Sequence, residues 1–285
     1  MSHPECRVWF ITGTSTGFGR ALTEVVLAKG EAVVATARTP SVLAELVAQH
    51  PSDRLLVLKL DITQPSQVAD AFERAREVFG RIDVVVNNAG FAYAGEFESV
   101  SDEAGRALME TNFWGTVSVT REALRFFREV NPKGHGGRLL QNSSVLGVVG
   151  RPAGAFYVAS KFALEGLTES LAQELDPAWN IKVTLIEPGW FHTNMKEATQ
   201  WSPPHPAYQN PDLPTAQIRA RRDSRVYPGD VAKGAAAIYE IAALKDTPLH
   251  FPLGEDAIAL LQAKFTEIER VVEDYRSWSE GLERD

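Results

Sequence analysis

Residues 12–19 read Thr12-Gly13-Thr14-Ser15-Thr16-Gly17-Phe18-Gly19 (TGTSTGFG) and follow directly on the apolar run Val8 to Ile11. Apolar side chains then recur at helical spacing from Gly17 to Lys29. Glycines let a backbone turn sharply and approach a ligand closely, and a helix N-terminus presents free N–H groups at the positive end of its dipole. The stretch therefore predicts a strand, a turn that can cradle phosphate, and a helix. A glycine-rich turn made only for packing is the alternative.

Short apolar runs alternate with amphipathic segments along the rest of the chain. The predicted strands are Val8–Ile11, Ala32–Thr36, Leu55–Leu60, Val84–Val86, Arg138–Gln141 and Lys182–Ile186, with a weaker seventh at Leu249–Phe251. The predicted helices are Gly17–Lys29, Ser41–Gln49, Pro65–Phe79, Asp102–Val130, Ala155–Leu175, Gly229–Leu244 and Asp256–Trp278. Near-continuous apolar runs are typical of parallel strands buried on both faces. We therefore expect a doubly wound parallel α/β sheet of about seven strands with helices on both faces, in a single domain over residues 1–285.

Two segments stand apart from this alternation. Six prolines interrupt Gly189 to Pro228, which follows the end of a predicted strand. Because open α/β sheets bind ligands at the carboxyl ends of their strands, we expect a substrate-binding loop or lid here, with an irregular surface insertion as the alternative. Glu255 to Asp285 is predicted as a helical extension that covers the substrate site, joins an interface or stays partly disordered.

Composition excludes several classes of function. A net charge of -8 gives no electrostatic support for binding nucleic acid or an anionic membrane surface, and no run of about 18 apolar residues occurs. The single Cys6 excludes an intrachain disulfide and fits a reducing compartment, so we expect a cytoplasmic protein. The six histidines lack paired ligand spacing, so the sequence supports no metal site.

Tyr157 and Lys161 lie four residues apart in the predicted helix 155–175. Positions i and i+4 share a helix face, so the phenol and the ammonium can act together on a molecule beside that face. An ammonium stabilises a phenolate and lowers the pKa of the phenol. The alternative is a tyrosine at the edge of the core and a solvated lysine.

Taken in order, these motifs resemble the short-chain dehydrogenase/reductases, whose glycine motif is Thr-Gly-x3-Gly-x-Gly. The resemblance covers roughly residues 7–193. Its further motifs are Asp61, Asn87-Asn88-Ala89-Gly90, Asn112, Ser144, Tyr157-x3-Lys161, Pro188-Gly189 and Thr193. It implies a Rossmann-type fold and hydride transfer between a nicotinamide cofactor and an alcohol or carbonyl.

The resemblance assigns Asn112, Ser144, Tyr157 and Lys161 to a catalytic tetrad. Tyr157 would protonate the carbonyl oxygen during reduction or remove the hydroxyl proton during oxidation, while Ser144 holds the same oxygen. Lys161 would also bind the nicotinamide ribose, and Asn112 would position a water that links Lys161 to solvent.

The cofactor preference is predicted from the end of the second strand. Ala37 stands where an NAD site places an acidic residue, and Arg38 follows. A guanidinium can hold a 2′-phosphate, so we expect NADP(H) in preference to NAD(H), with a surface arginine that binds nothing as the alternative. The cofactor residues implied by the resemblance, with Arg38, are Gly13, Ser15, Thr16, Gly17, Phe18, Gly19, Arg38, Asp61, Ile62, Asn88, Ala89, Gly90, Tyr157, Lys161, Pro188, Gly189, Phe191 and Thr193.

The resemblance also indicates the substrate pocket. Its predicted substrate-binding residues are Tyr93, Ser144, Leu146, Tyr157, Trp190 and Met195, with Phe91, Val145, Ala153, Phe156, Phe191 and Asn194 as further wall residues. These are mostly apolar, which favours a hydrophobic alcohol or carbonyl substrate.

The family further implies a homodimer or homotetramer formed through the helices 102–130 and 155–175. The alternatives within the fold are an epimerase or dehydratase and a non-catalytic NADP-binding sensor. A serine hydrolase would need a Gly-x-Ser-x-Gly elbow, which Ser144 lacks.

Overall fold

The computed structural model describes residues 6–224 and 226–284, without the side chains of residues 196 and 197. Seven parallel strands form the central sheet in the order β11-β7-β6-β4-β1-β2-β3. They are β1 (Val8–Ile11), β2 (Ala32–Ala37), β3 (Leu55–Lys59), β4 (Val84–Asn87), β6 (Gly137–Asn142), β7 (Ile181–Pro188) and β11 (His250–Leu253). The predicted doubly wound α/β fold is therefore confirmed, including the weak seventh strand.

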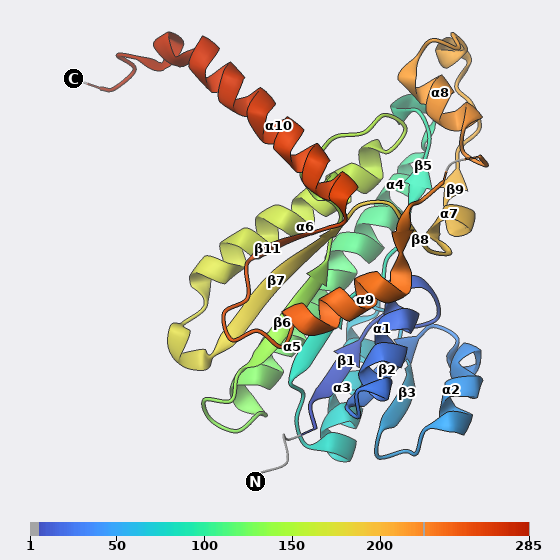
Figure 1. Cartoon of the computed structure of the whole chain (residues 1–285), viewed down its shortest axis with the longest axis vertical. Coiled ribbons are helices and arrows are strands. Elements are labelled where there is room, and N and C mark those ends of the chain that lie inside the picture. The colour runs from blue at the N-terminus through green and yellow to red at the C-terminus, as the bar shows by residue number, and fades with distance from the viewer. Residues whose placement is uncertain (1–5, 225, 285) are drawn as a thin grey trace.

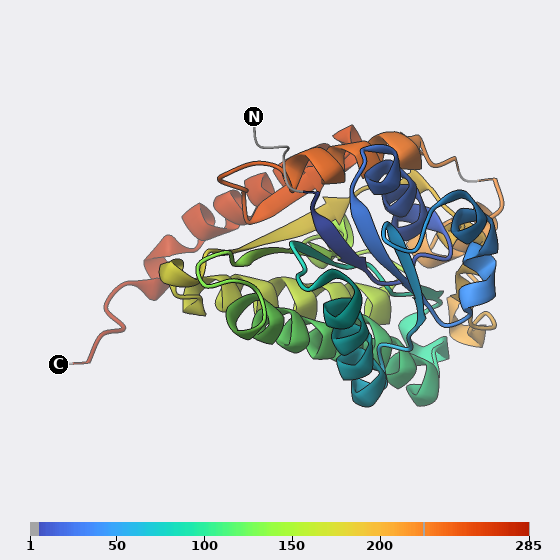
Figure 2. The ribbon, with the colours of Figure 1, turned by 90° about the horizontal axis from the view of Figure 1, so that it is seen from below.

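Helices cover both faces of this sheet (Figure 2). One face is covered by α1 (Gly17–Ala28), α2 (Ala44–Gln49) and α9 (Val231–Ile241), and the other by α3 (Pro65–Phe79), α4 (Asp102–Met109), α5 (Thr116–Glu129) and α6 (Ala155–Glu174). The inner strands β1, β2 and β4 are buried on both sides because they contribute alternate side chains to two separate cores, whereas the edge strands β3 and β11 are partly exposed. In β1, Trp9 and Ile11 pack under α1 and α9, whereas Phe10 stacks on Phe72 of α3.

The sheet reverses its strand order beside β1. The chain runs outward from β1 through β2 to β3, and then crosses to β4 on the other side of β1. A doubly wound sheet opens a crevice at such a point, beyond the carboxyl ends of its strands. The turn after β1 and the residues after β4 meet there.

The predicted helix 102–130 is divided by a π-helical segment. Glu110–Gly115 has i to i+5 bonding and joins α4 to α5 without a break in the chain direction. Such segments widen one turn and are frequent at functional sites. This one contains Asn112, and apolar periodicity did not reveal it.

The segment 189–228 consists of short elements joined by irregular chain (Figure 1). They are β8 (Phe191–His192), α7 (Met195–Ala198), β9 (Gln200–Trp201), α8 (Pro214–Ala220) and, just after the segment, β10 (Gly229–Asp230). β9 pairs with β5 (Tyr93–Ala94), and β8 pairs with β10. The buried Glu96 accepts hydrogen bonds from Arg219 of α8 at 2.6 and 3.2 Å, which ties this segment to the chain after β4. Residue 225 lies outside the described residues.

The C-terminal extension is a long helix, α10 (Glu255–Asp274), followed by a 3-10 turn at Arg276–Ser279. Its first turns pack on the body through Ala257 and Leu261, and the remainder projects away from it (Figure 1). The other 3-10 turns are Pro40–Leu43, Phe97–Ser99, Val145–Gly147, Pro177–Trp179 and Pro206–Tyr208. Among the described helices, none is long and apolar enough to cross a membrane.

Candidate active site

The glycine-rich turn after β1 needs its glycines for two reasons. Gly13 and Gly17 have φ values of 68° and 58°, where side chains are disfavoured. A Cβ on Gly13 would lie 2.8 Å from the Cα of Ala89, and one on Gly19 would overlap the carbonyl oxygen of Gly13. The turn thus packs against the chain after β4 and opens α1 with exposed Ser15 and Thr16 at its tip. This geometry suits a phosphate at the helix N-terminus.

Asn88 braces this turn from the neighbouring strand. Its Nδ2 donates to the carbonyl oxygens of Thr12 at 2.8 Å and Gly13 at 3.0 Å, while its backbone N–H donates to the Thr12 hydroxyl at 2.9 Å. Asn142, at the end of β6, donates in turn to the Asn88 side chain at 2.9 Å. The predicted cofactor residue Asn88 therefore shapes the turn through its side chain.

The second half of the predicted cofactor site meets the first. Pro188 and Gly189 end β7, and Phe191 packs edge-on against Phe18 with ring centroids 5.0 Å apart. Thr193 faces Gly17, because a Cβ on that glycine would lie 3.5 Å from the Thr193 Cβ. The fold thus brings together residues about 175 positions apart that the resemblance assigned to one cofactor.

Lys161 is held in a buried and directed position. Its ammonium donates to the carbonyl oxygen of Asn142 at 2.7 Å and lies 5.9 Å from the centroid of the Tyr157 ring. Burial lowers the pKa of Lys161 to about 8, although the charge of Glu165 opposes this shift. The bond to Asn142 links the lysine, through Asn88, to the glycine-rich turn.

The Tyr157 hydroxyl faces the cavity beside Ser144. Burial raises the pKa of Tyr157, and hydrogen bonding to Ser144 and the charge of Arg151 oppose the rise only in part. This direction is opposite to the one expected from Lys161, because the lysine ammonium is directed at a carbonyl oxygen and burial dominates. Tyr157 is therefore a neutral phenol at pH 7, which is the form that donates a proton.

Asn112 lies in the π-helical segment and is 1% exposed. Its Oδ1 accepts from the backbone of Phe91 at 3.0 Å, and its Nδ2 donates to Phe91 at 2.9 Å and to the Ser160 hydroxyl at 3.2 Å. A Cβ on Gly90 would lie 2.9 Å from Asn112 Oδ1, so this glycine is required for the approach. Asn112 joins the chain after β4 to the catalytic helix α6.

Three of the remaining predicted cofactor residues follow the strands β2 and β3. Asp61, after β3, uses one carboxylate oxygen to accept from the backbone and hydroxyl of Thr63 at 3.0 and 2.7 Å. Ile62 beside it is buried against Gly115. Arg38 is exposed directly after β2, and no hydrogen bond or ion pair joins its side chain to another of the described residues.

A cavity of about 720 Å³ opens at the carboxyl edge of the sheet, in front of Tyr157. All six predicted substrate-binding residues line it: Tyr93, Ser144, Leu146, Tyr157, Trp190 and Met195. Ala153 and Phe191 line it too, whereas Phe91, Val145, Phe156 and Asn194 are not among its lining residues. Phe156 instead stacks on Phe97, with ring centroids 5.6 Å apart.

Sequence reasoning missed the charged residues of this cavity. Arg151, Arg222 and Asp223 line it, and the Arg151 guanidinium stacks over the Trp190 ring at 4.6 Å. The sequence also did not predict that the carbonyl oxygen of Asn142 accepts a hydrogen bond from Lys161. No motif marks these positions, since an arginine before a helix and an arginine–aspartate pair in a loop are ordinary surface patterns.

The fold defines a class of protein, the Rossmann-type α/β proteins, and here a tyrosine and a buried lysine lie close to the glycine-rich turn. The family model described as short chain dehydrogenase matches residues 7–202. An uncharacterised oxidoreductase of Schizosaccharomyces pombe is 40% identical over 280 residues, covering 96% of this chain and 91% of that protein. A 3-ketodihydrosphingosine reductase of Bacteroides thetaiotaomicron is 33% identical, covering 87% of this chain and 88% of that protein.

Solved structures agree with this family. A short-chain dehydrogenase from Streptomyces avermitilis has a TM-score of 0.88 and 35% identity, covering 99% of this chain and 100% of that chain. A short-chain dehydrogenase from Burkholderia cenocepacia in complex with NADP has a TM-score of 0.73 and 26% identity, covering 95% and 97%. The chain belongs to the short-chain dehydrogenase family and is an oxidoreductase.

Proposed function

We propose that the protein interconverts a hydrophobic secondary alcohol and its ketone, or a primary alcohol and its aldehyde, with NADP(H), using Tyr157 as the general acid and base. The observation that carries this proposal is the placement of Tyr157 and Ser144 on one cavity, with the buried Lys161 ammonium 5.9 Å from the centroid of the Tyr157 ring. Phe18, from a glycine-rich turn that fits a dinucleotide phosphate, lines the same cavity.

The chain supplies the proton, and the bound nicotinamide supplies the hydride. During reduction Tyr157 donates its phenolic proton to the carbonyl oxygen, which the Ser144 hydroxyl holds by a hydrogen bond. Tyr157 is suited to this step because burial keeps it protonated. The Lys161 ammonium binds the nicotinamide ribose hydroxyls and stabilises the phenolate that remains. Oxidation follows the same steps in reverse.

The residues present fit the cofactor. A phosphate would fit at the α1 N-terminus, where side chains on Gly13 and Gly19 would collide with backbone. The exposed Arg38 after the buried Ala37 can make paired hydrogen bonds to a 2′-phosphate, which supports NADP(H) over NAD(H). The Burkholderia cenocepacia relative was solved in complex with NADP, which supports the same class of cofactor.

The cavity wall supports a hydrophobic substrate. Tyr93, Leu146, Trp190 and Met195 present apolar or aromatic groups in front of Tyr157. The segment 189–228 supplies much of this wall, and we propose that it acts as a lid over the substrate. The name of one relative, 3-ketodihydrosphingosine reductase, favours a keto compound as substrate.

A homodimer or homotetramer completes the proposal. Trp114 and Phe162 are 52% and 43% exposed on the π-helical segment and α6, the helices expected to pack against a second copy. Exposed aromatic side chains of this size are typical of interfaces.

The decisive experiment compares wild type with Tyr157→Phe on a panel of hydrophobic ketones and secondary alcohols, following absorbance at 340 nm. We expect the variant to lose turnover by about 10²–10⁴-fold because it lacks the proton donor. NADPH binding, measured by fluorescence titration, should remain. Full turnover in the variant would show that another group transfers the proton, and product formation without net absorbance change would indicate an epimerase or dehydratase.

A further inference from the structure

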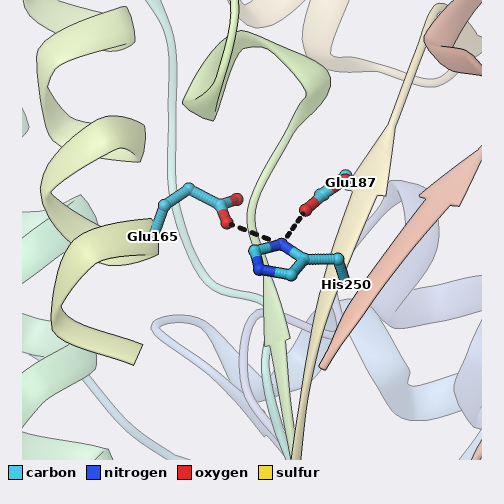
Figure 3. Close-up of side chains that lie close together, drawn as sticks. All are labelled: Glu165, Glu187 and His250. Carbon is cyan, nitrogen blue, oxygen red and sulfur yellow. Dashed lines mark hydrogen bonds and ion pairs between the residues drawn. The ribbon is translucent and has the colours of Figure 1, made fainter. Parts of the chain in front are cut away.

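Three side chains from distant parts of the chain converge about one turn along α6 from Lys161. Glu165 projects from α6, Glu187 from β7 and His250 from β11, and all three point toward one another (Figure 3). His250 Nδ1 lies 2.7 Å from Glu187 Oε1 and 3.7 Å from Glu165 Oε2. One oxygen or nitrogen atom from each residue lies within 4.8 Å of the others.

The two carboxyl groups are buried and poorly satisfied. Glu165 and Glu187 are 4% and 1% exposed. Three of their four carboxyl oxygens, both of Glu165 and Oε2 of Glu187, have no hydrogen-bond partner of normal geometry within the described part of the chain. The Ser143 hydroxyl faces Glu165 but also makes no bond of normal geometry. Buried carboxylates without donors are costly, so these oxygens are aimed at a place where a positive charge is favoured.

The histidine is oriented from its far side. Its Nε2 lies 3.7 Å from Oε1 of Glu169, one turn beyond Glu165 on α6. Histidines that bind metals almost always have a partner on the ring nitrogen that faces away from the metal, and Glu169 lies on that side of His250. Nδ1 shares a hydrogen bond of 2.7 Å with Glu187 Oε1, and a bound cation would replace the proton of that bond. The His250 side chain is 42% exposed, which gives a cation a path from solvent.

We propose that Glu165, Glu187 and His250 form a binding site for a divalent first-row cation such as Zn²⁺. One imidazole nitrogen and two carboxylate oxygens are a ligand set that Zn²⁺ accepts, with water completing the coordination on the exposed side. The bound cation joins α6, β7 and β11 behind Lys161 and Ser144. This proposal departs from the expectation of no metal site, which rested on spacing along the chain and could not register residues 165, 187 and 250 meeting in space.

The test uses the full chain in a Cys6→Ser background, so that the exposed thiol cannot bind zinc. After treatment with EDTA and dialysis, ZnCl2 is titrated by calorimetry at pH 7, and thermal unfolding is followed with and without zinc. We expect one zinc per chain and a Tm higher by about 4 °C at a zinc concentration 100 times the Kd. His250→Ala should weaken binding by roughly 100-fold, and Glu169→Gln by roughly 10-fold.

The matched control is His135→Ala, which removes a histidine that faces a single carboxylate, that of Asp83. It should bind zinc as the background protein does. Equal affinity in background protein and His250→Ala, or the absence of stoichiometric binding to folded protein, would overturn the proposal and leave His250 as a hydrogen-bond partner of Glu187 alone. Because Glu169 is exposed, its variant keeps the comparison available if His250→Ala unfolds.

Discussion

Lys161 shows how burial sets the chemistry of a single side chain. Burial lowers its pKa from 10.5 to about 8, so the group is an ammonium below pH 8 and a neutral amine above. The proposed reaction needs the ammonium to bind ribose hydroxyls and to stabilise phenolate. We therefore expect kcat/KM for NADPH, which reports the free enzyme, to fall above pH 8 by about tenfold per unit.

The pH profile of ketone reduction between pH 6 and 10 checks this expectation. Lys161→Met should have low activity with no descending limb near pH 8, because the titrating group is gone. Tyr157 cannot produce that limb, since burial moves its pKa upward from 10. A wild-type profile that stays flat to pH 9.5 would contradict the assignment.

Arg38 carries the second prediction at this scale. Its guanidinium is exposed at the end of β2, so Arg38→Ala removes a phosphate ligand without disturbing the core. We expect KM for NADPH to rise by about 10–100-fold, equivalent to losing one or two charge-assisted hydrogen bonds, while KM for NADH stays unchanged. Steady-state kinetics with both cofactors give the answer. The control is Arg74→Ala, which removes an exposed arginine on α3. If Arg38→Ala changed KM equally for NADPH and NADH, the predicted preference for NADP(H) would be wrong.

The candidate catalytic residues could be selected from the sequence because each belongs to a short motif with a chemical reason, and their roles stay a prediction. Asn142 and Arg151 could not be selected in this way, because their contacts with Lys161 and with the cavity depend on the folded chain. Asn142 holds Lys161 through a backbone carbonyl, which has no sequence signature. Arg151 lies near Tyr157 only because the fold turns the chain before α6 over the cavity. The direction of the Tyr157 pKa shift was also missed, since burial of a phenol cannot be read from spacing.

At the scale of elements, the start of α1 tests whether the glycine turn is a cradle. Gly19 is a helical residue, so alanine there has a favourable propensity, but its Cβ would overlap the Gly13 carbonyl and the Asn88 amide. We expect Gly19→Ala to lower stability by about 1–3 kcal/mol and to weaken NADPH binding. The same change at Gly166 of α6, where nothing lies within 4 Å, should raise stability by about 0.5–1 kcal/mol.

Urea unfolding and NADPH titration of both glycine variants check this pair. Because the substitution is identical, the difference in unfolding free energy between Gly19→Ala and Gly166→Ala measures the cost of the overlap at Gly19. Unchanged NADPH affinity in a folded Gly19→Ala protein would show that the turn does not cradle the cofactor.

Helices and strands with a strong apolar period were predicted to within a few residues. Elements that form only through contacts between distant parts of the chain were not predicted. The seven strands follow from their apolar runs. The π-helical segment at 110–115 was missed because its apolar pattern resembles that of an α-helix. The two-residue strands β5, β8, β9 and β10 were missed because they exist only through pairing with segments distant in the chain.

At the scale of the whole molecule, the accessible surface is larger than a monomer of this size normally has. It measures 15393 Å², whereas a compact monomer of 31.3 kDa exposes about 12,000 Å². The projecting part of α10 contributes to this excess (Figure 1). The face that packs on the body at Leu261 continues beyond it as Phe265, Ile268 and Val272, which are 52%, 43% and 56% exposed.

A protruding helix with such a face is marginal alone in water, so we expect a second copy of the chain to cover it. The excess surface is ample for a standard interface of about 1,600 Å². We therefore predict that Phe265→Glu with Val272→Glu lowers the assembly mass measured by light scattering, for example from tetramer to dimer, while the folded body remains active. Ala263→Glu with Thr266→Glu adds the same charge to the opposite face of α10 and should leave the mass unchanged. A wild-type protein that is only monomeric would contradict the predicted homo-oligomer. Equal masses for both double variants would indicate that the contacts between the copies lie on α4, α5 and α6 instead of α10.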